Sequence, residues 1–322
     1  MASTNPQTQH ITTSPGVTLA YRLLPCRSPS PSHPSSPPLV LLMHFRGTMH
    51  HWDPLLLTQL SAHRPLLVLD NAGIGASTGQ VPPSFAGWAD HVLELLVALK
   101  LELVDVLGFS MGGCVAQLVA LRAPRAGVRV RRLVLAGTTA SAGPGIKLLT
   151  SEEELAPFMR LRGAESEDEQ RAAFLECFFL PGEEGRREGE KVWERVCRGR
   201  EAGRGDGLAE YAGQEAAKRQ AVAYARFMDL RRRSEGSFDR LAELTMPVLV
   251  ANGSNDVLIP THNSYVIWQN LQNSRAQLHL FPASGHGFLY QYAQRFARLV
   301  NEFLDVEEEG EEVVKWGRGS RL

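Results

Sequence analysis

Short apolar runs of strand length alternate along this chain with longer segments whose apolar residues recur at helical spacing. Most of the runs show little alternation between apolar and polar residues, which is typical of strands buried on both faces of a sheet. Strands that alternate with helices predict an α/β fold with a mostly parallel central sheet and helices on both faces. The strands are expected at residues 16–22, 39–45, 65–70, 103–107, 131–137, 247–251 and 276–281.

The strand pattern stops in the middle of the chain. Helices separated by loops rich in glycine and charge are expected there instead, and residues 183–190 and 198–206 are predicted to be mobile surface loops. The predicted organisation is an α/β core at residues 1–139 and 240–305, a helical insertion at residues 140–239, and a flexible acidic tail at residues 306–322.

Composition narrows the classes of function. The chain has 322 residues, 43% of them apolar, and a formal net charge of −1, so neither nucleic acid nor an anionic membrane surface is favoured as a partner. No apolar run is long enough to span a bilayer, and no secretory leader is expected. The four cysteines (Cys26, Cys114, Cys177 and Cys197) have neither metal-ligand nor disulfide-framework spacing, which predicts reduced thiols in an intracellular protein.

The segment from Gly108 to Gly112 carries the most specific chemistry. It reads Gly-Phe-Ser-Met-Gly and stands between an apolar run and a helical segment, which is the strand–turn–helix setting of a nucleophilic serine. Glycine two residues on either side of Ser110 leaves room for a sharp turn. The following helix directs its N-terminal N–H groups toward the reaction centre. Ser110 is therefore the candidate nucleophile.

A serine hydroxyl needs a base, and the base needs an acid, before it becomes a strong nucleophile. Asp256 follows the expected strand at residues 247–251, and His286 follows the strand at residues 276–281, between two glycines. Both residues therefore come just after the end of a strand, as Ser110 does. The order serine, aspartate, histidine along the chain agrees with a Ser-His-Asp triad.

These residues resemble those of the α/β-hydrolase superfamily, and the resemblance covers about residues 16–305. It implies an α/β-hydrolase fold in which the helical insertion is a cap, or lid, after the sixth strand. It also implies that Ser110 attacks an acyl carbon, that His286 shuttles the proton and that Asp256 orients His286, without a cofactor or a metal. Residues 108–113 are also similar to those of cofactor-free haloperoxidases, or perhydrolases, which suggests perhydrolysis as a side activity.

The resemblance implies two backbone donors for the oxyanion. One is the N–H of Met111, the residue after the nucleophile. The other normally follows a His-Gly pair, where this chain has Met-His-Phe-Arg-Gly at residues 43–47. Alignment on the histidine makes Arg46 the donor, whereas the gapless alignment to Trp52 makes Phe45 the donor. We prefer Phe45, because that alignment needs no gap.

Three basic features of the sequence, one of them a single arginine, each have a structural interpretation, which we call the plain one, and a functional interpretation. The Arg46 side chain is expected to be solvated or in a salt bridge rather than to bind a substrate carboxylate or phosphate. The run Arg-Arg-Arg at residues 231–233 fits a solvated helix face better than a site for an anionic carrier such as coenzyme A. His50 and His51 lack further ligands at zinc spacing, so no metal site is predicted.

The helical insertion is rich in large apolar residues. Some of them are expected to pack the core of the insertion, and others to face Ser110 as a pocket for an apolar acyl group or ring. These residues are Phe158, Met159, Phe174, Phe178, Phe179, Trp193, Tyr211, Tyr224 and Phe227.

The chain ends in Ser320-Arg321-Leu322, which is similar to the Ser-Lys-Leu peroxisomal address. The charged stretch before it predicts an extended tail that keeps the tripeptide accessible. The peroxisome is therefore the expected location and its import receptor an expected partner, with the cytoplasm as the location if the tripeptide is not used. Some fungal peroxisomal members of the superfamily serve secondary-metabolite or toxin biosynthesis, and we take such a role as a hypothesis.

The favoured function is a cofactor-free serine hydrolase that cleaves an ester, thioester or lactone with an apolar acyl group through an acyl-enzyme. The same triad serves C–C bond hydrolysis of a diketone and acyl transfer, and both stay open as alternatives. A binding protein for a small ligand is a third alternative, although its triad would be degraded, and the triad here is complete. The sequence does not identify the residues that bind the substrate.

Overall fold

The computed structural model describes residues 7–13, 16–28, 36–201 and 211–306. Within them an eight-stranded sheet has the strand order β1-β2-β4-β3-β5-β6-β7-β8. β2 runs antiparallel to both of its neighbours, and all other neighbouring strands are parallel. The strands are β1 (Gln9–Thr12), β2 (Thr18–Leu24), β3 (Leu39–Leu42), β4 (Leu66–Leu69), β5 (Leu103–Phe109), β6 (Arg129–Ala136), β7 (Val248–Gly253) and β8 (Ala276–Phe281).

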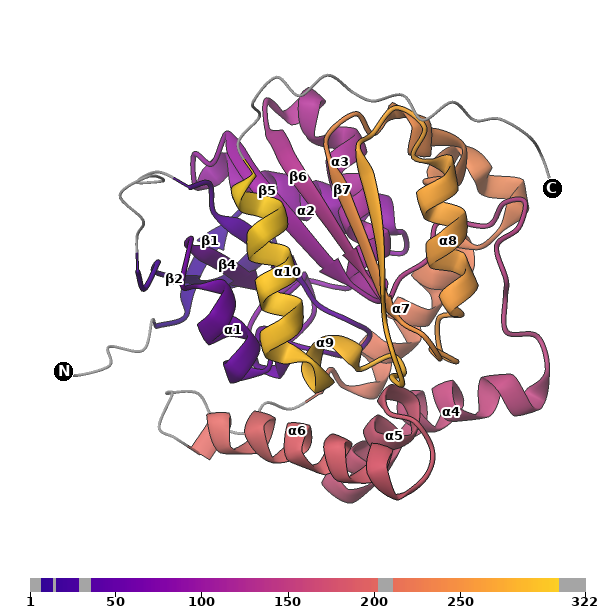
Figure 1. Ribbon diagram of the computed structural model, residues 1–322. Coiled ribbons are helices and arrows are strands. Elements are labelled where there is room, and N and C mark those ends of the chain that lie inside the picture. Colours follow the sequence, from indigo (N-terminus) through magenta and orange to yellow (C-terminus); the bar gives the residue numbers. More distant parts are fainter. Residues whose placement is uncertain (1–6, 14–15, 29–35, 202–210, 307–322) are drawn as a thin grey trace.

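Helices cover both faces of this sheet (Figure 1). α1 and α10 pack together on one face, α2 and α3 pack together on the other, and α8 packs against β7 and β8. This arrangement confirms the predicted mostly parallel sheet with helices on both faces. The core helices are α1 (Pro54–Leu60), α2 (Phe85–Ala98), α3 (Met111–Arg122), α8 (Thr261–Asn270), α9 (Phe288–Gln291) and α10 (Ala293–Asp305), with the short turns η1 (Met49–His51) and η2 (Ala123–Ala126).

The sequence pattern misses one strand, β1 at the edge of the sheet. It reads Gln-His-Ile-Thr and is exposed along most of its length. Backbone pairing with β2, from Gln9 opposite Tyr21 to Thr12 opposite Thr18, holds it in place. Ile11 alone among its residues packs against the core. A strand held in this way has no apolar alternation that could predict it.

The predicted helical insertion forms between β6 and β7. Its helices α4, α5 and α6 lie beyond the edge at which the parallel strands end (Figure 1). We call the helices α4 to α7 the cap; the domain limits drawn from the sequence stay a prediction. The elements of this stretch are α4 (Glu152–Gly163), α5 (Glu167–Phe178), α6 (Glu183–Glu201), α7 (Gln214–Phe227), η3 (Leu230–Glu235) and η4 (Phe238–Glu243).

The cap has an aromatic core of its own, centred on Phe174. The ring centroid of Phe174 lies 4.5 Å from that of Phe178, 5.7 Å from that of Phe179 and 5.6 Å from that of Trp193. These four residues are buried, whereas Met159 is 51% exposed. The cap therefore folds around its own apolar residues, and only part of its apolar surface is left to face the rest of the molecule.

The loop predicted at residues 183–190 is wrong, because these residues form the first turns of α6. Two glycines and a high content of charge suggested the loop, but one of these glycines, Gly189, packs closely against α5 and the residue after it. A Cβ on Gly189 would lie 2.5 Å from Leu175 Cδ2 and 2.8 Å from Phe179 Cδ2. Glycine at this position thus allows α6 to approach its neighbour, although glycine inside a helix is unfavourable by itself.

Two other predictions fall wholly or partly outside the described residues. The loop predicted at residues 198–206 is helical through Glu201, and its remainder is not described. The acidic tail with Ser320-Arg321-Leu322 also lies outside, apart from its first residue, so the peroxisomal address and its receptor stay predictions. In the part of the chain that the structure describes, no helix combines the length and apolarity needed to cross a membrane.

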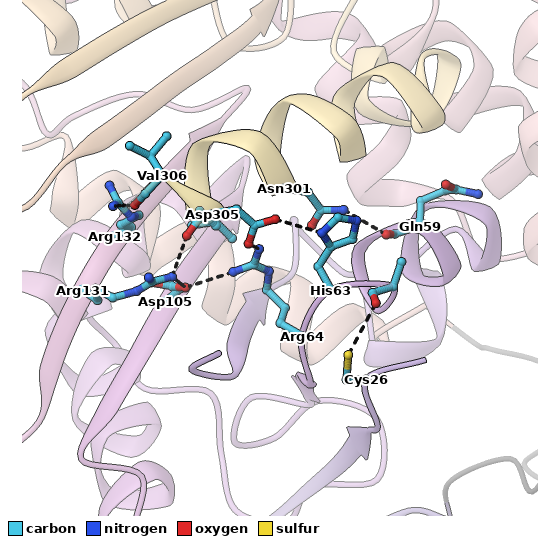
Figure 2. A network of polar contacts seen from close by, with 12 residues as sticks. Cys26, Gln59, His63, Arg64, Asp105, Arg131, Arg132, Asn301, Asp305 and Val306 are labelled. Atoms are coloured by element: carbon cyan, nitrogen blue, oxygen red, sulfur yellow. Dashed lines mark hydrogen bonds and ion pairs between the residues drawn. The ribbon is translucent and has the colours of Figure 1, made fainter. Parts of the chain in front are cut away.

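A cluster of buried charges fastens the last helix to the sheet (Figure 2). Asp105 of β5 accepts two hydrogen bonds from Arg131 of β6, at 3.0 and 2.6 Å, and lies 3.6 Å from Nη1 of Arg64. Arg64 pairs in turn with Asp305 at the end of α10, and Arg131 also donates to the carbonyl of Leu304 at 2.9 Å. The side chains of Asp105 and Arg64 are fully buried, so each charge depends on its partner for compensation.

We expect Asp105→Asn to lower the free energy of unfolding by about 3–5 kcal/mol, because it removes the buried carboxylate that pairs with Arg131 and one of the two carboxylates near the buried Arg64. The matched control is Asp90→Asn. Asp90 makes the same two-pronged contact with Arg122, at 2.8 and 2.7 Å, but both side chains are partly exposed, so the loss should stay below about 1 kcal/mol. Urea unfolding measures both free energies of unfolding. Equal losses in the two variants would show that burial does not decide how much such an ion pair stabilises the protein.

Candidate active site

Ser110 stands at the junction of β5 and α3 with φ 57° and ψ −123°. A positive φ is costly for a residue other than glycine and marks a strained turn. The turn can form because Gly108 and Gly112 have no side chains. A Cβ on Gly108 would lie 2.4 Å from the carbonyl oxygen of Gly112, and a Cβ on Gly112 would lie 2.1 Å from the carbonyl oxygen of Leu42. Thr138 holds the turn by donating to the Ser110 carbonyl at 2.7 Å. The structure therefore places Ser110 at the predicted sharp turn.

His286 and Asp256 lie in the loops after β8 and β7 and contact each other. His286 Nδ1 lies 2.7 Å from Asp256 Oδ2, and both side chains are fully buried. The other carboxylate oxygen, Oδ1, accepts hydrogen bonds from the N–H groups of Leu258 and Ile259, at 2.9 Å each. Because a carboxylate only accepts, it favours the tautomer of His286 with its proton on Nδ1, which leaves Nε2 as the basic nitrogen.

Ser110 and His286 line the same cavity. Nε2 of His286 is buried, and within the described ranges it has no hydrogen-bond partner. The imidazole stacks on Phe109, with ring centroids 5.0 Å apart, and meets Phe178 edge-on at 5.1 Å. The structure therefore brings Ser110, Asp256 and His286 into one site, in which the basic nitrogen is not engaged by another protein group.

Two backbone N–H groups near Ser110 are candidates for the oxyanion hole. The N–H of Met111 belongs to the first turn of α3, where helical N–H groups have no partner within the helix. The N–H of Arg46 is engaged, because it donates to Oε1 of Gln220 at 2.9 Å. Phe45 lines the cavity beside Ser110, and among the described residues its N–H donates to no backbone carbonyl. The geometry thus favours Phe45 over Arg46.

His44, the residue before Phe45, is buried and also lines the cavity. Burial, with a smaller contribution from the neighbouring His286, lowers the pKa of His44 to about 4, and the hydrogen bond to Phe45 opposes this shift only in part. Nδ1 of His44 lies 2.8 Å from the carbonyl oxygen of Phe45, which can only accept, so that Nδ1 carries the proton. His44 therefore contacts the carbonyl oxygen of the Phe45 peptide as a neutral side chain.

The expectation that the Arg46 side chain is solvated or in a salt bridge is wrong. The residue is only 2% exposed, and its guanidinium donates to the carbonyls of Leu161 and Ala164, at 2.8 Å each, and of Ala212 at 2.9 Å. Nor does it line the cavity as a site for a substrate anion. No sequence pattern could reveal these contacts, because every residue supplies a backbone carbonyl.

The basic run at residues 231–233 agrees with its plain interpretation. The guanidinium groups of residues 231–233 are partly or largely exposed and pair with carboxylates of Asp229, Glu235 and Asp239. Their charge is thus compensated within the protein itself. Within the residues that are described, no group of three or more His, Cys, Asp or Glu side chains is placed to hold a metal ion.

The cavity at Ser110 has a volume of about 340 Å³ and mainly apolar walls. Phe158, Phe178 and Tyr224 of the cap line it, so three of the nine apolar residues singled out in the insertion face the site. Lys147, in the segment before α4, is the one lysine, arginine, aspartate or glutamate among the described residues that line the cavity. A cavity of this size and lining suits a small, largely apolar molecule.

The fold and this site define the class of protein. The family model of the alpha/beta hydrolase fold matches residues 37–292. The chain therefore belongs to the α/β-hydrolase fold family, which confirms the predicted fold class and the predicted enzyme class of hydrolase.

Several relatives of this chain are named as hydrolases. The chain is 29% identical over 255 residues to a 2-hydroxymuconate semialdehyde hydrolase of Pseudomonas sp. (strain CF600), which covers 78% of this chain and 80% of that protein. It is 27% identical over 280 residues to a 2-hydroxy-6-oxo-2,4-heptadienoate hydrolase of Pseudomonas putida, covering 84% and 90%. An alpha/beta hydrolase fold protein from Chitinophaga pinensis has a similar structure, with a TM-score of 0.77, 30% identity and coverage of 94% and 98%.

Proposed function

We propose that this protein is a cofactor-free serine hydrolase with Ser110 as nucleophile, His286 as general base and acid, and Asp256 as the residue that orients His286. The observation that carries the proposal is the buried 2.7 Å contact between His286 Nδ1 and Asp256 Oδ2, beside a cavity that Ser110 shares. The backbone N–H groups of Met111 and Phe45 complete the site as oxyanion donors.

The proposed reaction has two halves. His286 Nε2 takes the hydroxyl proton of Ser110 while Oγ attacks the acyl carbon, and Asp256 stabilises the imidazolium that forms. The N–H groups of Met111 and Phe45 stabilise the negative charge that develops on the carbonyl oxygen. His286 then protonates the leaving group. In the second half it takes a proton from water, which attacks the acyl-enzyme and releases the acid.

The lining of the cavity supports an ester, thioester or lactone with an apolar acyl group as the substrate. Phe158, Tyr224 and Leu155 of the cap face the site together with Ile259 and Pro260 of the core. Their side chains would exclude water from a hydrocarbon chain or ring but offer few polar partners. A role in secondary-metabolite or toxin biosynthesis, or perhydrolysis as a side activity, stays a prediction.

The second candidate is hydrolysis of a C–C bond beside a ketone. The two Pseudomonas relatives are named for an aldehyde and an oxo compound, and both compounds, a muconate semialdehyde and a dienoate, carry a carboxylate. Lys147 lines the cavity here, and the side chain of Asn263 holds its backbone at both the N–H (2.8 Å) and the carbonyl (2.9 Å). A lysine fixed at this place could pair with the carboxylate of such a substrate.

A substrate panel tests the proposal and separates the two candidates. Purified protein is given p-nitrophenyl esters of increasing acyl length and, separately, a 2-hydroxy-6-oxo-dienoate. We expect ester hydrolysis with a burst of p-nitrophenol, and an acyl adduct on the peptide that contains Ser110. Faster cleavage of the dienoate than of any ester would make C–C hydrolysis the main function. A folded protein that cleaves neither would contradict both candidates and favour the ligand-binding alternative.

A further inference from the structure

The residue after the proposed donor Phe45 is fastened to the cap through its backbone. The N–H of Arg46 donates to Oε1 of Gln220 in α7 at 2.9 Å, and its carbonyl accepts from the N–H of Ala212, just before α7, at 2.8 Å. Arg46 adopts φ 61°, a left-handed conformation that costs energy for a residue with a side chain. Contacts on both sides of the residue hold it there.

The side chain of Arg46 reaches a second part of the cap. Its Nη1 donates to the carbonyls of Leu161 and Ala164, at 2.8 Å each, where α4 ends. The last carbonyls of a helix have no partner within the helix and carry the negative end of its dipole, so a guanidinium is well suited to this position. Within the described part of the chain, no carboxylate pairs with Arg46, and backbone carbonyls of the cap surround its buried charge.

Phe45 and Arg46 share one planar peptide group. His44 contacts the carbonyl oxygen of that peptide at 2.8 Å, and the cap fixes Arg46 on its other side. If the cap contacts of Arg46 were lost, this peptide would keep the contact of its carbonyl oxygen to His44 but lose that of its N–H to Gln220, and it would be freer to turn. The N–H of Phe45, one peptide earlier, would shift with it. The position of this N–H thus depends on whether the cap is seated.

We propose that Arg46 is a positioning residue that couples the seating of the cap to the geometry of the oxyanion hole. The inference rests on the proposed function, because it requires the Phe45 N–H to be an oxyanion donor. With the cap in place, its carbonyls and Gln220 hold Arg46 in the left-handed conformation and Phe45 in position. Without these contacts the loop relaxes, and the donor moves away from the place where the charge develops.

The test uses a small organophosphate, diethyl p-nitrophenyl phosphate, which makes little demand on the acyl pocket. Ser110 Oγ attacks phosphorus, p-nitrophenolate leaves, and His286 takes the hydroxyl proton; negative charge develops on the phosphoryl oxygen, as on an acyl oxygen. We expect Arg46→Met to lower the rate constant of this reaction about 10- to 100-fold, because a donor displaced by about 1 Å loses most of its effect. Arg46→Lys should restore part of the rate.

Two further variants keep the result interpretable. Arg160→Met is the matched control, since Arg160 lies on the same helix α4 but forms an exposed ion pair with Glu176, and it should react at the native rate. Gln220→Met removes only the acceptor of the Arg46 N–H, and we expect a smaller loss of rate in the same direction. It therefore tests the inference even if Arg46→Met does not fold, which a thermal unfolding curve will show.

The outcomes are distinguishable. If the native protein does not react with the organophosphate, the proposed function fails and the inference with it. If the native protein reacts and folded Arg46→Met and Gln220→Met react equally fast, the inference alone is overturned. It is also overturned if both variants raise only the KM of long-chain esters, because Arg46 would then support the pocket and not the oxyanion hole.

Discussion

Replacement of Ser110 by alanine is expected to lower kcat for every acyl substrate by about 10⁴- to 10⁶-fold, because the members of a triad act as a unit and the acyl-enzyme can no longer form. The variant should fold. The N–H of Ser110 donates to the Ala136 carbonyl at 2.9 Å, and its carbonyl accepts from Thr138, so the turn is held by the backbone of the residue and not by its hydroxyl. Steady-state hydrolysis of a p-nitrophenyl ester measures the loss.

The matched control is Ser254→Ala. Ser254 lies in the loop that carries Asp256, but its exposed hydroxyl donates to the side chain of Asn255 and, among the described residues, to no group of the site, so we expect native activity. His286→Ala should be about as inactive as Ser110→Ala, since either change removes the same unit. Substantial turnover by Ser110→Ala would show that another nucleophile is at work and would overturn the proposed assignment.

The parts of this molecule that follow from the sequence are those that depend on local pattern. The sheet was predicted because several of its central strands, such as β3 and β7, are buried on both faces and therefore largely apolar. The three proposed triad residues were found because each follows a strand end, where a parallel sheet gathers its loops. Gly108 and Gly112 were informative because their lack of a side chain is required by direct backbone contacts.

The parts that the sequence misses depend on contacts between distant segments. Arg46 binds backbone carbonyls more than 100 residues away, and a carbonyl has no residue type that a pattern could reveal. Gly189 allows α6 to pack against α5, but glycine is also common in loops, so the sequence pattern suggested a loop instead. The lining of the cavity belongs to this class too. The packing of the cap helices decides which of their apolar residues face Ser110. The sequence shows that such residues are present but not which of them line the cavity.

Asp256→Asn is expected to lower kcat by about 10⁴-fold while leaving the shape of the site intact. The reason lies in what surrounds the carboxylate. Oδ1 accepts hydrogen bonds from the N–H groups of Leu258 and Ile259, at 2.9 Å each, so the amide oxygen of asparagine must take this place. The amide NH₂ then faces Nδ1 of His286, where Oδ2 stood. Because two donors cannot pair, the ring moves its proton to Nε2, and that nitrogen can no longer accept the proton of Ser110.

The measurement is kcat across a range of pH, together with the thermal unfolding curve of the variant. A wrong tautomer predicts low activity in a protein that still unfolds near the native temperature, with partial recovery at high pH, where the serine hydroxyl loses its proton more easily. Asp239→Asn is the matched control, since its carboxylate forms only a partly exposed ion pair with Arg233, and it should keep native activity. Near-native activity of Asp256→Asn would instead mean that the tautomer of His286 is set by another group, and the assignment of Asp256 would fall.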